Sequence, residues 1–96
     1  MFLEITGEDI EAARERRTDS TLNRQRDSYN AERDCPIGVA LVRQFSIPDV
    51  RNVWAHPNYL RVATERFKAT QAIRKYMLQW DMYGRAEPKR FKLYPY

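Results

Sequence analysis

Two residues of this chain could carry out nucleophilic chemistry together: its single cysteine, Cys35, and its single histidine, His56. A thiol at the amino end of a helix ionises more readily, because the helix dipole stabilises the thiolate. The thiolate would also need a general base within hydrogen-bond reach, and His56 would have to supply it. The spacing of the two residues matches no catalytic pattern. We therefore expect Cys35 to be a structural cap beside the core, His56 to be a turn residue, and the protein not to be an enzyme.

The sequence also gives little basis for a metal ion or a cofactor. One cysteine and one histidine cannot form an all-thiolate or a thiolate–imidazole zinc site within one chain. The basic loop at residues 87–90 lacks the glycines that a phosphate-binding loop uses. We expect no metal and no cofactor.

Basic and aromatic residues are the remaining side chains that could bind a partner. Residues 1–34 hold six basic and nine acidic side chains, residues 35–63 hold three and one, and residues 64–96 hold eight and three. The basic carboxyl-terminal third suits nucleic acid, a nucleotide or an acidic protein surface, and the plain alternative is an ordinary solvated surface. The candidate partner-binding residues are four arginines of the amino-terminal third and five residues expected on one face of a sheet: Arg14, Arg17, Arg24, Arg26, Tyr59, Arg61, Arg90, Lys92 and Tyr94.

A core helix is expected to begin at Pro36. Proline suits the first helical position, where its missing N–H would have no partner, and Cys35 is then the N-cap. Residues 37–45 are apolar almost all round the helix, which is typical of a buried helix. Gly38 costs about 1 kcal/mol of helix propensity relative to alanine. We therefore expect another backbone to approach Gly38 closely.

Residues 35–41, Cys-Pro-Ile-Gly-Val-Ala-Leu, resemble a Cys-Pro-Ile/Val-Gly/Ala-x-Ala-Leu motif of small proteins encoded by tailed phages and prophages. The order of elements expected here, a strand, an acidic-start helix, the Cys-Pro helix, a Val-containing strand, a helix and a final strand, is similar to theirs. The resemblance implies a phage origin and a bacterial cytoplasm, and it implies no reaction. The chain departs from that pattern by the Arg-rich segment 17–33.

The polar segment at about residues 17–34 has two interpretations. It either extends the first helix through opposite charges three or four residues apart, or it forms a loop because it buries too little apolar surface to order itself. We expect a helix from the Thr6 cap to about Arg24, followed by a loop. Arg43 and Gln44, at the other end of the core helix, are expected to form its solvent-exposed edge.

Alternating and helical periodicities predict the remaining elements. Residues 2–6, 50–54, 59–63 and 90–94 read as strands, and the middle two form a hairpin around the turn at 55–58. Thr64 is expected to cap an amphipathic helix that ends at Gly84. In the last strand Phe91 and Leu93 should face the core.

These elements predict one α+β domain, residues 1–96. A small antiparallel sheet of about four strands would be covered on one face by two main helices, with a charged amino-terminal helix beside them. The sequence has no apolar run of membrane-spanning length, and its amino end lacks the features of a signal peptide, so we expect no membrane contact. An edge strand at the carboxyl end leaves room for a homodimer.

Three functions from different classes are compatible with this sequence. The favoured one is a small phage-encoded, non-enzymatic binding protein that inhibits or modulates a bacterial host or defence protein by covering its surface, as an anti-CRISPR protein does. The second is a nucleic-acid or nucleotide-binding protein that uses the basic carboxyl-terminal third. The third is an enzyme that depends on Cys35.

Overall fold

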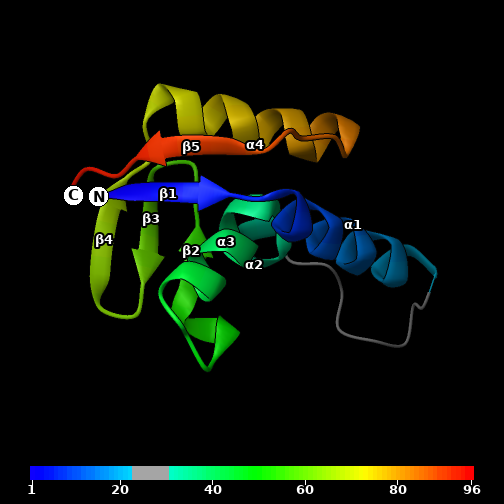
Figure 1. Cartoon of the computed structure of the whole chain (residues 1–96), viewed down its shortest axis with the longest axis horizontal. Helices are drawn as coiled ribbons and strands as arrows, with labels where there is room; N and C mark the ends of the chain where they lie inside the picture. Colours follow the sequence, from blue (N-terminus) through cyan, green and yellow to red (C-terminus); the bar gives the residue numbers. More distant parts are fainter. Residues whose placement is uncertain (23–30) are drawn as a thin grey trace.

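The computed structural model of the protein describes residues 1–22 and 31–96 (Figure 1), and Arg24 and Arg26 lie outside these ranges. None of the described helices is long and apolar enough to cross a membrane. The two chain ends lie side by side at one edge of the molecule (Figure 1). Along the chain the elements are β1 (Phe2–Ile5), α1 (Gly7–Leu22), α2 (Ala31–Asp34), α3 (Pro36–Gln44), a 3-10 turn (Val50–Asn52), β2 (Val53–Ala55), β3 (Tyr59–Val62), β4 (Glu65–Lys68), α4 (Gln71–Tyr83) and β5 (Lys89–Lys92).

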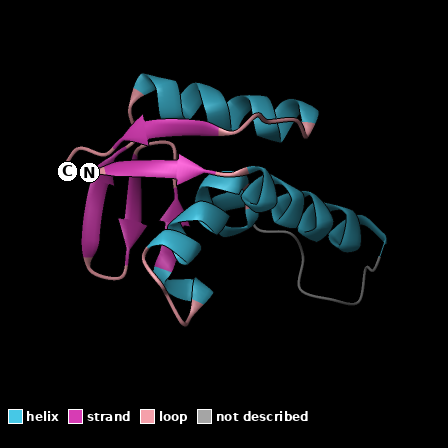
Figure 2. Cartoon of the chain, in the orientation of Figure 1, coloured by secondary structure: helices cyan, strands magenta, loops and turns pink. Residues whose placement is uncertain are grey.

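The strands form two antiparallel sheets, one of order β1-β5 and one of order β2-β3-β4, with the helices packed around them (Figure 2). The residues after β5 join the sheets: the Lys68 N–H donates to the Tyr94 carbonyl at 2.8 Å, and the Tyr96 N–H donates to the Arg66 carbonyl at 3.0 Å. The α+β class and the antiparallel pairing agree with the prediction, but the single sheet of about four strands is wrong. Pro95, which bridges to Phe67, has no N–H to donate, so a regular ladder cannot continue there.

The core lies between the sheets and the helices. The two main helices predicted from the sequence, α3 and α4, both contribute to it, and α1 adds Ile10 and Ala13. Phe91 and Leu93 of the last strand are buried, as the alternation predicted. The Tyr76 ring of α4 meets the Phe91 ring edge-on at 5.4 Å, so α4 lies on the core side of β5.

The start of α3 follows the prediction. Cys35 is the N-cap, Pro36 is the first helical residue, and the Gly38 N–H donates to the Cys35 sulfur at 3.4 Å. The expected close approach to Gly38 is also confirmed, because a Cβ at this position would lie 2.5 Å from the Arg33 carbonyl oxygen of α2. Only glycine lets α2 and α3 meet in this way.

Two elements differ from the prediction. The strand expected at residues 50–54 starts later, at Val53, because the Asp49 carboxylate accepts the Arg51 N–H at 2.9 Å and starts a 3-10 turn. The helix expected to begin at Thr64 begins instead at Gln71, with Thr70 as its cap, while residues 65–68 form β4. Ala63 takes a positive φ of 54°, which turns the chain back so that β4 pairs with β3.

Gly84 ends α4 in the left-handed conformation, with a φ of 64°, as predicted. The first helix was expected to reach about Arg24, and the described part of α1 runs to Leu22. The expected loop after it contains one described helical turn, α2.

The predicted solvent-exposed edge of α3 is exposed at Arg43 and half-buried at Gln44, and both residues also contact β1. Gln44 pairs with this strand through both ends of its amide: its Nε2 donates to the Phe2 carbonyl at 2.7 Å, and its Oε1 accepts the Glu4 N–H at 3.1 Å. Arg43 Nη2 donates to the Glu4 carbonyl at 2.7 Å. These side chains satisfy the edge of β1 that β5 does not cover, because an open strand edge needs partners.

Candidate functional site: a basic and aromatic sheet face

The side chains that point away from the core form one surface across both sheets. Successive side chains of a strand point to opposite faces. The residues that alternate with the buried Val53, Leu60, Phe67 and Phe91 therefore face outward. We call this surface the outer face, and it consists of Phe2, Glu4, Trp54, Tyr59, Arg61, Arg66, Lys68, Arg90, Lys92, Tyr94 and Tyr96.

The pairing of the strands brings cations and rings of the outer face together. Arg61 lies directly opposite Trp54 on one side and Arg66 on the other. In the other sheet, Lys92 lies opposite Phe2. The outer face holds cations from three strands, β3, β4 and β5, and its carboxylate is that of Glu4.

Rings of the outer face lie against four of its cations, those of Arg61, Arg66, Arg90 and Lys92. The Arg90 guanidinium lies 4.1 Å from the centroid of the Phe2 ring, and the Lys92 ammonium lies 5.3 Å from that of Tyr94. The Arg66 guanidinium lies 5.4 Å from the centroid of the Tyr59 ring. Cation–π contacts of this kind contribute about 0.5–1 kcal/mol each at exposed sites. They orient positive charge outward without neutralising it.

Tyr59 is the centre of a ring cluster at one end of the outer face. Its ring stacks on His56 at 5.2 Å and meets Tyr96 edge-on at 6.2 Å. His56 lies in the turn, as predicted, where its Nδ1 accepts the Asn58 N–H at 3.1 Å. These contacts hold Tyr59 in one orientation under Arg66.

Two N–H groups of the outer face, Trp54 Nε1 and Arg61 Nε, are covered by neighbouring atoms and have no acceptor within residues 1–22 and 31–96. The Arg61 guanidinium lies over the Trp54 ring at 5.6 Å. A buried donor without an acceptor costs about 1–3 kcal/mol.

The structure brings together the five sheet residues that the sequence predicted: Tyr59, Arg61, Arg90, Lys92 and Tyr94 all lie on the outer face. Their role in binding stays a prediction. Besides Glu4, the sequence did not reveal five other members. Residues 65–68 were interpreted as the start of a helix, but the alternation of polar residues around Phe67 could have indicated a strand. The alternation of tyrosines around Pro95 could likewise have indicated an extended segment. The members missed in this way are Phe2, Trp54, Arg66, Lys68 and Tyr96.

The predicted arginines of α1 lie elsewhere. Arg14 pairs with Glu11 at 3.0 Å on the exposed side of the helix. Arg17 Nη1 donates to the Trp80 carbonyl at 2.6 Å, and its guanidinium lies 5.6 Å from the centre of the Trp80 ring. Arg17 thus caps the carboxyl end of α4, where it is a second donor to a carbonyl that also accepts the Gly84 N–H at 2.7 Å. Neither arginine is brought to the outer face.

Cys35 is held as a protonated thiol at neutral pH. Burial raises its pKa to about 11, although the N–H groups of Gly38 and Ile37 act in the opposite direction. His56 contacts Asn58 and Tyr59 at one end of the outer face. In the described part of the chain, no group of three or more potential ligands is arranged to hold a metal ion.

The outer face is thus an array of cations and rings, and no group of three or more potential metal ligands lies among its described residues. Comparisons with protein-family models, with curated proteins and with solved structures find no match to this chain.

Proposed function

We propose that this protein is a non-enzymatic binding protein that acts by covering a surface of another macromolecule with its outer face. The proposal rests on one observation: aromatic rings, and not carboxylates, hold four cations of the outer face in place. None of the ion pairs in the described part of the chain involves these cations. Their charge is therefore available to a partner, and their orientation is set before the partner arrives. Such preorganisation lowers the entropic cost of binding.

The target we propose is a bacterial host or defence protein with an acidic surface, which this protein would inhibit by occlusion. Tyrosine, tryptophan and arginine contribute most to protein–protein hot spots. The rings also favour a protein over a nucleobase, because those of Phe2, Trp54 and Tyr59 each already carry a cation of the chain. A base would have to displace these cations before it could stack. The resemblance of residues 35–41 to phage proteins supports a bacterial target.

A second candidate function is binding of single-stranded nucleic acid. Cations that alternate with rings on an exposed sheet are the features with which proteins bind phosphates and stack bases. Tyr96 favours this candidate, because the residue is 67% exposed and its ring carries no cation among the described residues.

A pull-down from bacterial lysate separates the two candidates. The tagged protein is incubated with lysate, with and without nuclease, and bound material is eluted by a salt gradient and identified by mass spectrometry. The outer-face variant Arg66→Ala/Lys68→Ala is compared with Arg51→Ala/Arg74→Ala. Both variants lose two positive charges from exposed residues, and Arg51→Ala also removes the exposed ion pair with Asp49, a pair of the kind that contributes about 0–1 kcal/mol to stability.

The proposal predicts one stoichiometric protein that resists nuclease and is retained by the control variant but lost by the outer-face variant. Capture that collapses with nuclease or with modest salt would favour nucleic acid instead, because phosphate contacts release counterions. Equal capture by both variants would show that the outer face is not the binding surface.

A further inference from the structure

The solvent side of α4 carries large apolar side chains. Leu78, Met82 and Tyr83 are 58%, 60% and 66% exposed. The opposite side of the helix is in the core, where Tyr76 meets Phe91 of β5. The apolar side chains therefore point away from the sheets, and they form a surface distinct from the outer face.

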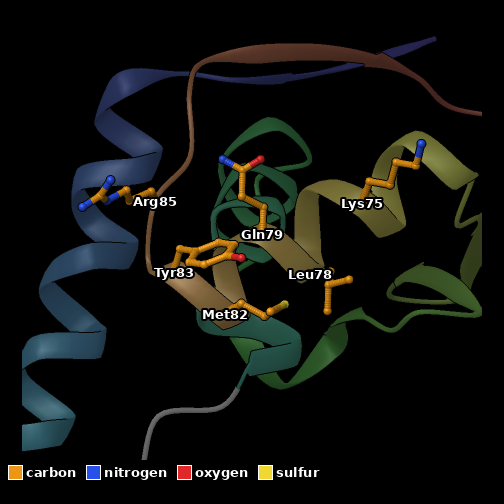
Figure 3. Close-up of a pocket in the computed structure, with 6 residues that line it drawn as sticks. All are labelled: Lys75, Leu78, Gln79, Met82, Tyr83 and Arg85. Carbon is orange, nitrogen blue, oxygen red and sulfur yellow. The ribbon is translucent and has the colours of Figure 1, made fainter.

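These side chains border an elongated groove. A hollow of about 570 Å³ is lined by Lys75, Leu78, Gln79, Met82, Tyr83 and Arg85 (Figure 3). A second hollow, of about 410 Å³, shares Lys75 and Gln79 with the first and continues to Gln71 and Lys89. Two adjoining hollows along one helix suit an elongated occupant, such as a helix, better than a flat membrane surface.

The charges around the groove restrict the occupant. Lys75, Arg85 and Lys89 line its hollows, and among the residues that the structure describes no carboxylate lines either of them. Asp81 carries the carboxylate of α4, and it does not line either hollow. A ligand with apolar side chains in the middle and acidic side chains at its flanks would complement this pattern.

A second copy of the chain would not fit. In an antiparallel two-fold arrangement centred between Leu78 and Met82, Lys75 of each copy faces Arg85 of the other, because both residues lie five positions from the centre. In a parallel arrangement each cation faces its own equivalent. Like charges in contact disfavour both arrangements.

We infer that the α4 groove, defined by the residues lining its two hollows, docks an acidic amphipathic helix of a partner protein. Apolar side chains of that helix would lie on Leu78 and Met82, as in other helix-in-groove complexes. Its acidic flanks would pair with Lys75 and Arg85. The inference concerns a surface separate from the one used in the proposed function and does not depend on it.

Two synthetic 18-residue amphipathic helices test the inference. They share one Leu/Met stripe and differ only in their flanking residues, which are glutamates in one peptide and lysines in the other. Binding of each fluorescein-labelled peptide to the full chain is followed by fluorescence anisotropy. We expect the acidic peptide to bind at least tenfold more tightly than the basic one, and Leu78→Asp to weaken its binding at least tenfold.

The charge-reversed variant Lys75→Glu/Arg85→Glu should exchange the preference, so that the basic peptide binds better. The outer-face variant Arg66→Glu/Lys68→Glu should bind the acidic peptide like the wild type, which separates this test from that of the proposed function. Circular dichroism checks that each variant folds.

Three results would overturn the inference. The first is that both peptides bind equally well, or that neither peptide binds at concentrations below about 1 mM. The second is sedimentation as a dimer that Leu78→Asp dissociates, which would assign the groove to a second copy. The third is Leu78-dependent binding to vesicles of phosphatidylcholine and phosphatidylserine without binding of the acidic peptide, which would assign it to a membrane surface.

Discussion

Arg43 holds Asp9 through two parallel hydrogen bonds, from Nε to Oδ1 at 2.9 Å and from Nη2 to Oδ2 at 3.0 Å. Asp9 is only 3% exposed, and it also accepts the Thr6 N–H at 2.9 Å, while the Asp9 N–H donates to Thr6 Oγ1 at 3.2 Å. This reciprocal capping arrangement starts α1. Because Arg43 also contacts the Glu4 carbonyl, one guanidinium ties α3 to α1 and to β1. The pair thereby positions the strand that carries Phe2 on the outer face.

Asp9→Asn should destabilise the protein by about 1–3 kcal/mol, because it removes one partner of a mostly buried ion pair whose arginine is half exposed. Burial alone would raise the pKa of Asp9, but hydrogen bonds from Arg43 and Thr6 outweigh burial and lower it. A pKa that is lower in the folded than in the unfolded state means that the ionised carboxylate stabilises the fold. This stabilisation is complete at pH values above the pKa of the unfolded state, about 4, and is lost as pH falls through the pKa of the folded state. Urea unfolding should show the difference between wild type and variant shrinking from pH 5 towards pH 2.

Glu11→Gln serves as the control for this prediction, because Glu11 pairs with Arg14 on the exposed surface, where ion pairs contribute 0–1 kcal/mol or so. A difference between wild type and Asp9→Asn that stays constant down to pH 2 would show that the ionised carboxylate is not what stabilises the fold.

Gly38→Ala should destabilise the protein by about 1–3 kcal/mol, although alanine is the better helix former by about 1 kcal/mol. The reason is the Arg33 carbonyl oxygen, which a Cβ would approach to 2.5 Å, so that α2 or α3 has to shift. Gly7→Ala is the matched control: nothing lies within 4 Å of its added Cβ, so it should be neutral or stabilising. Thermal unfolding of both variants checks the prediction, and equal melting temperatures would contradict it.

The caps of this fold could be predicted from the sequence because each depends on a few neighbouring residues. Thr6, Cys35 with Pro36, and Gly84 all act where local spacing places them. The start of α4 could not be predicted, because Thr64 and Thr70 are equally good caps. Pairing of β4 with β3 and with the residues after β5 decides between them.

Part of the outer face could be predicted because the alternation of side chains along a strand is also a local pattern. Alternation along β3 and β5 exposes Tyr59, Arg61, Arg90 and Lys92, and this alternation can be read locally. The continuity of the surface depends on the bridge between Phe67 and Pro95, which are 28 positions apart in the sequence. No local pattern reports such a contact.

Arg17→Ala should destabilise the protein by about 1–2 kcal/mol, because the Trp80 carbonyl at the end of α4 loses a charged donor. Arg14→Ala, on the exposed side of the same helix, should change stability by less than about 0.5 kcal/mol. Urea unfolding of the two variants measures the difference. If Arg17→Ala left stability unchanged but weakened partner binding, Arg17 would be a contact residue, as the sequence suggested.

Cys35 should react slowly with a thiol reagent. With a pKa of about 11, its thiolate fraction at pH 8 is far below that of an unfolded cysteine. Labelling of the native chain by 5,5′-dithiobis(2-nitrobenzoic acid) at pH 8 should therefore be a hundredfold or so slower than labelling in urea. Cys35→Ser, which cannot be labelled, gives the background. Rapid labelling of the native chain at neutral pH would restore the Cys35-dependent enzyme as a candidate.

The central claim is that the outer face binds a protein, and site-specific photo-crosslinking in bacterial cells tests it most directly. A benzophenone amino acid replaces Tyr94 on the outer face, where 44% of the side chain is exposed, or Glu15 on the exposed side of α1 as the control. We predict one defined protein adduct from position 94 and none from position 15. An adduct from position 15 alone, or a nuclease-sensitive adduct from position 94, would contradict the claim.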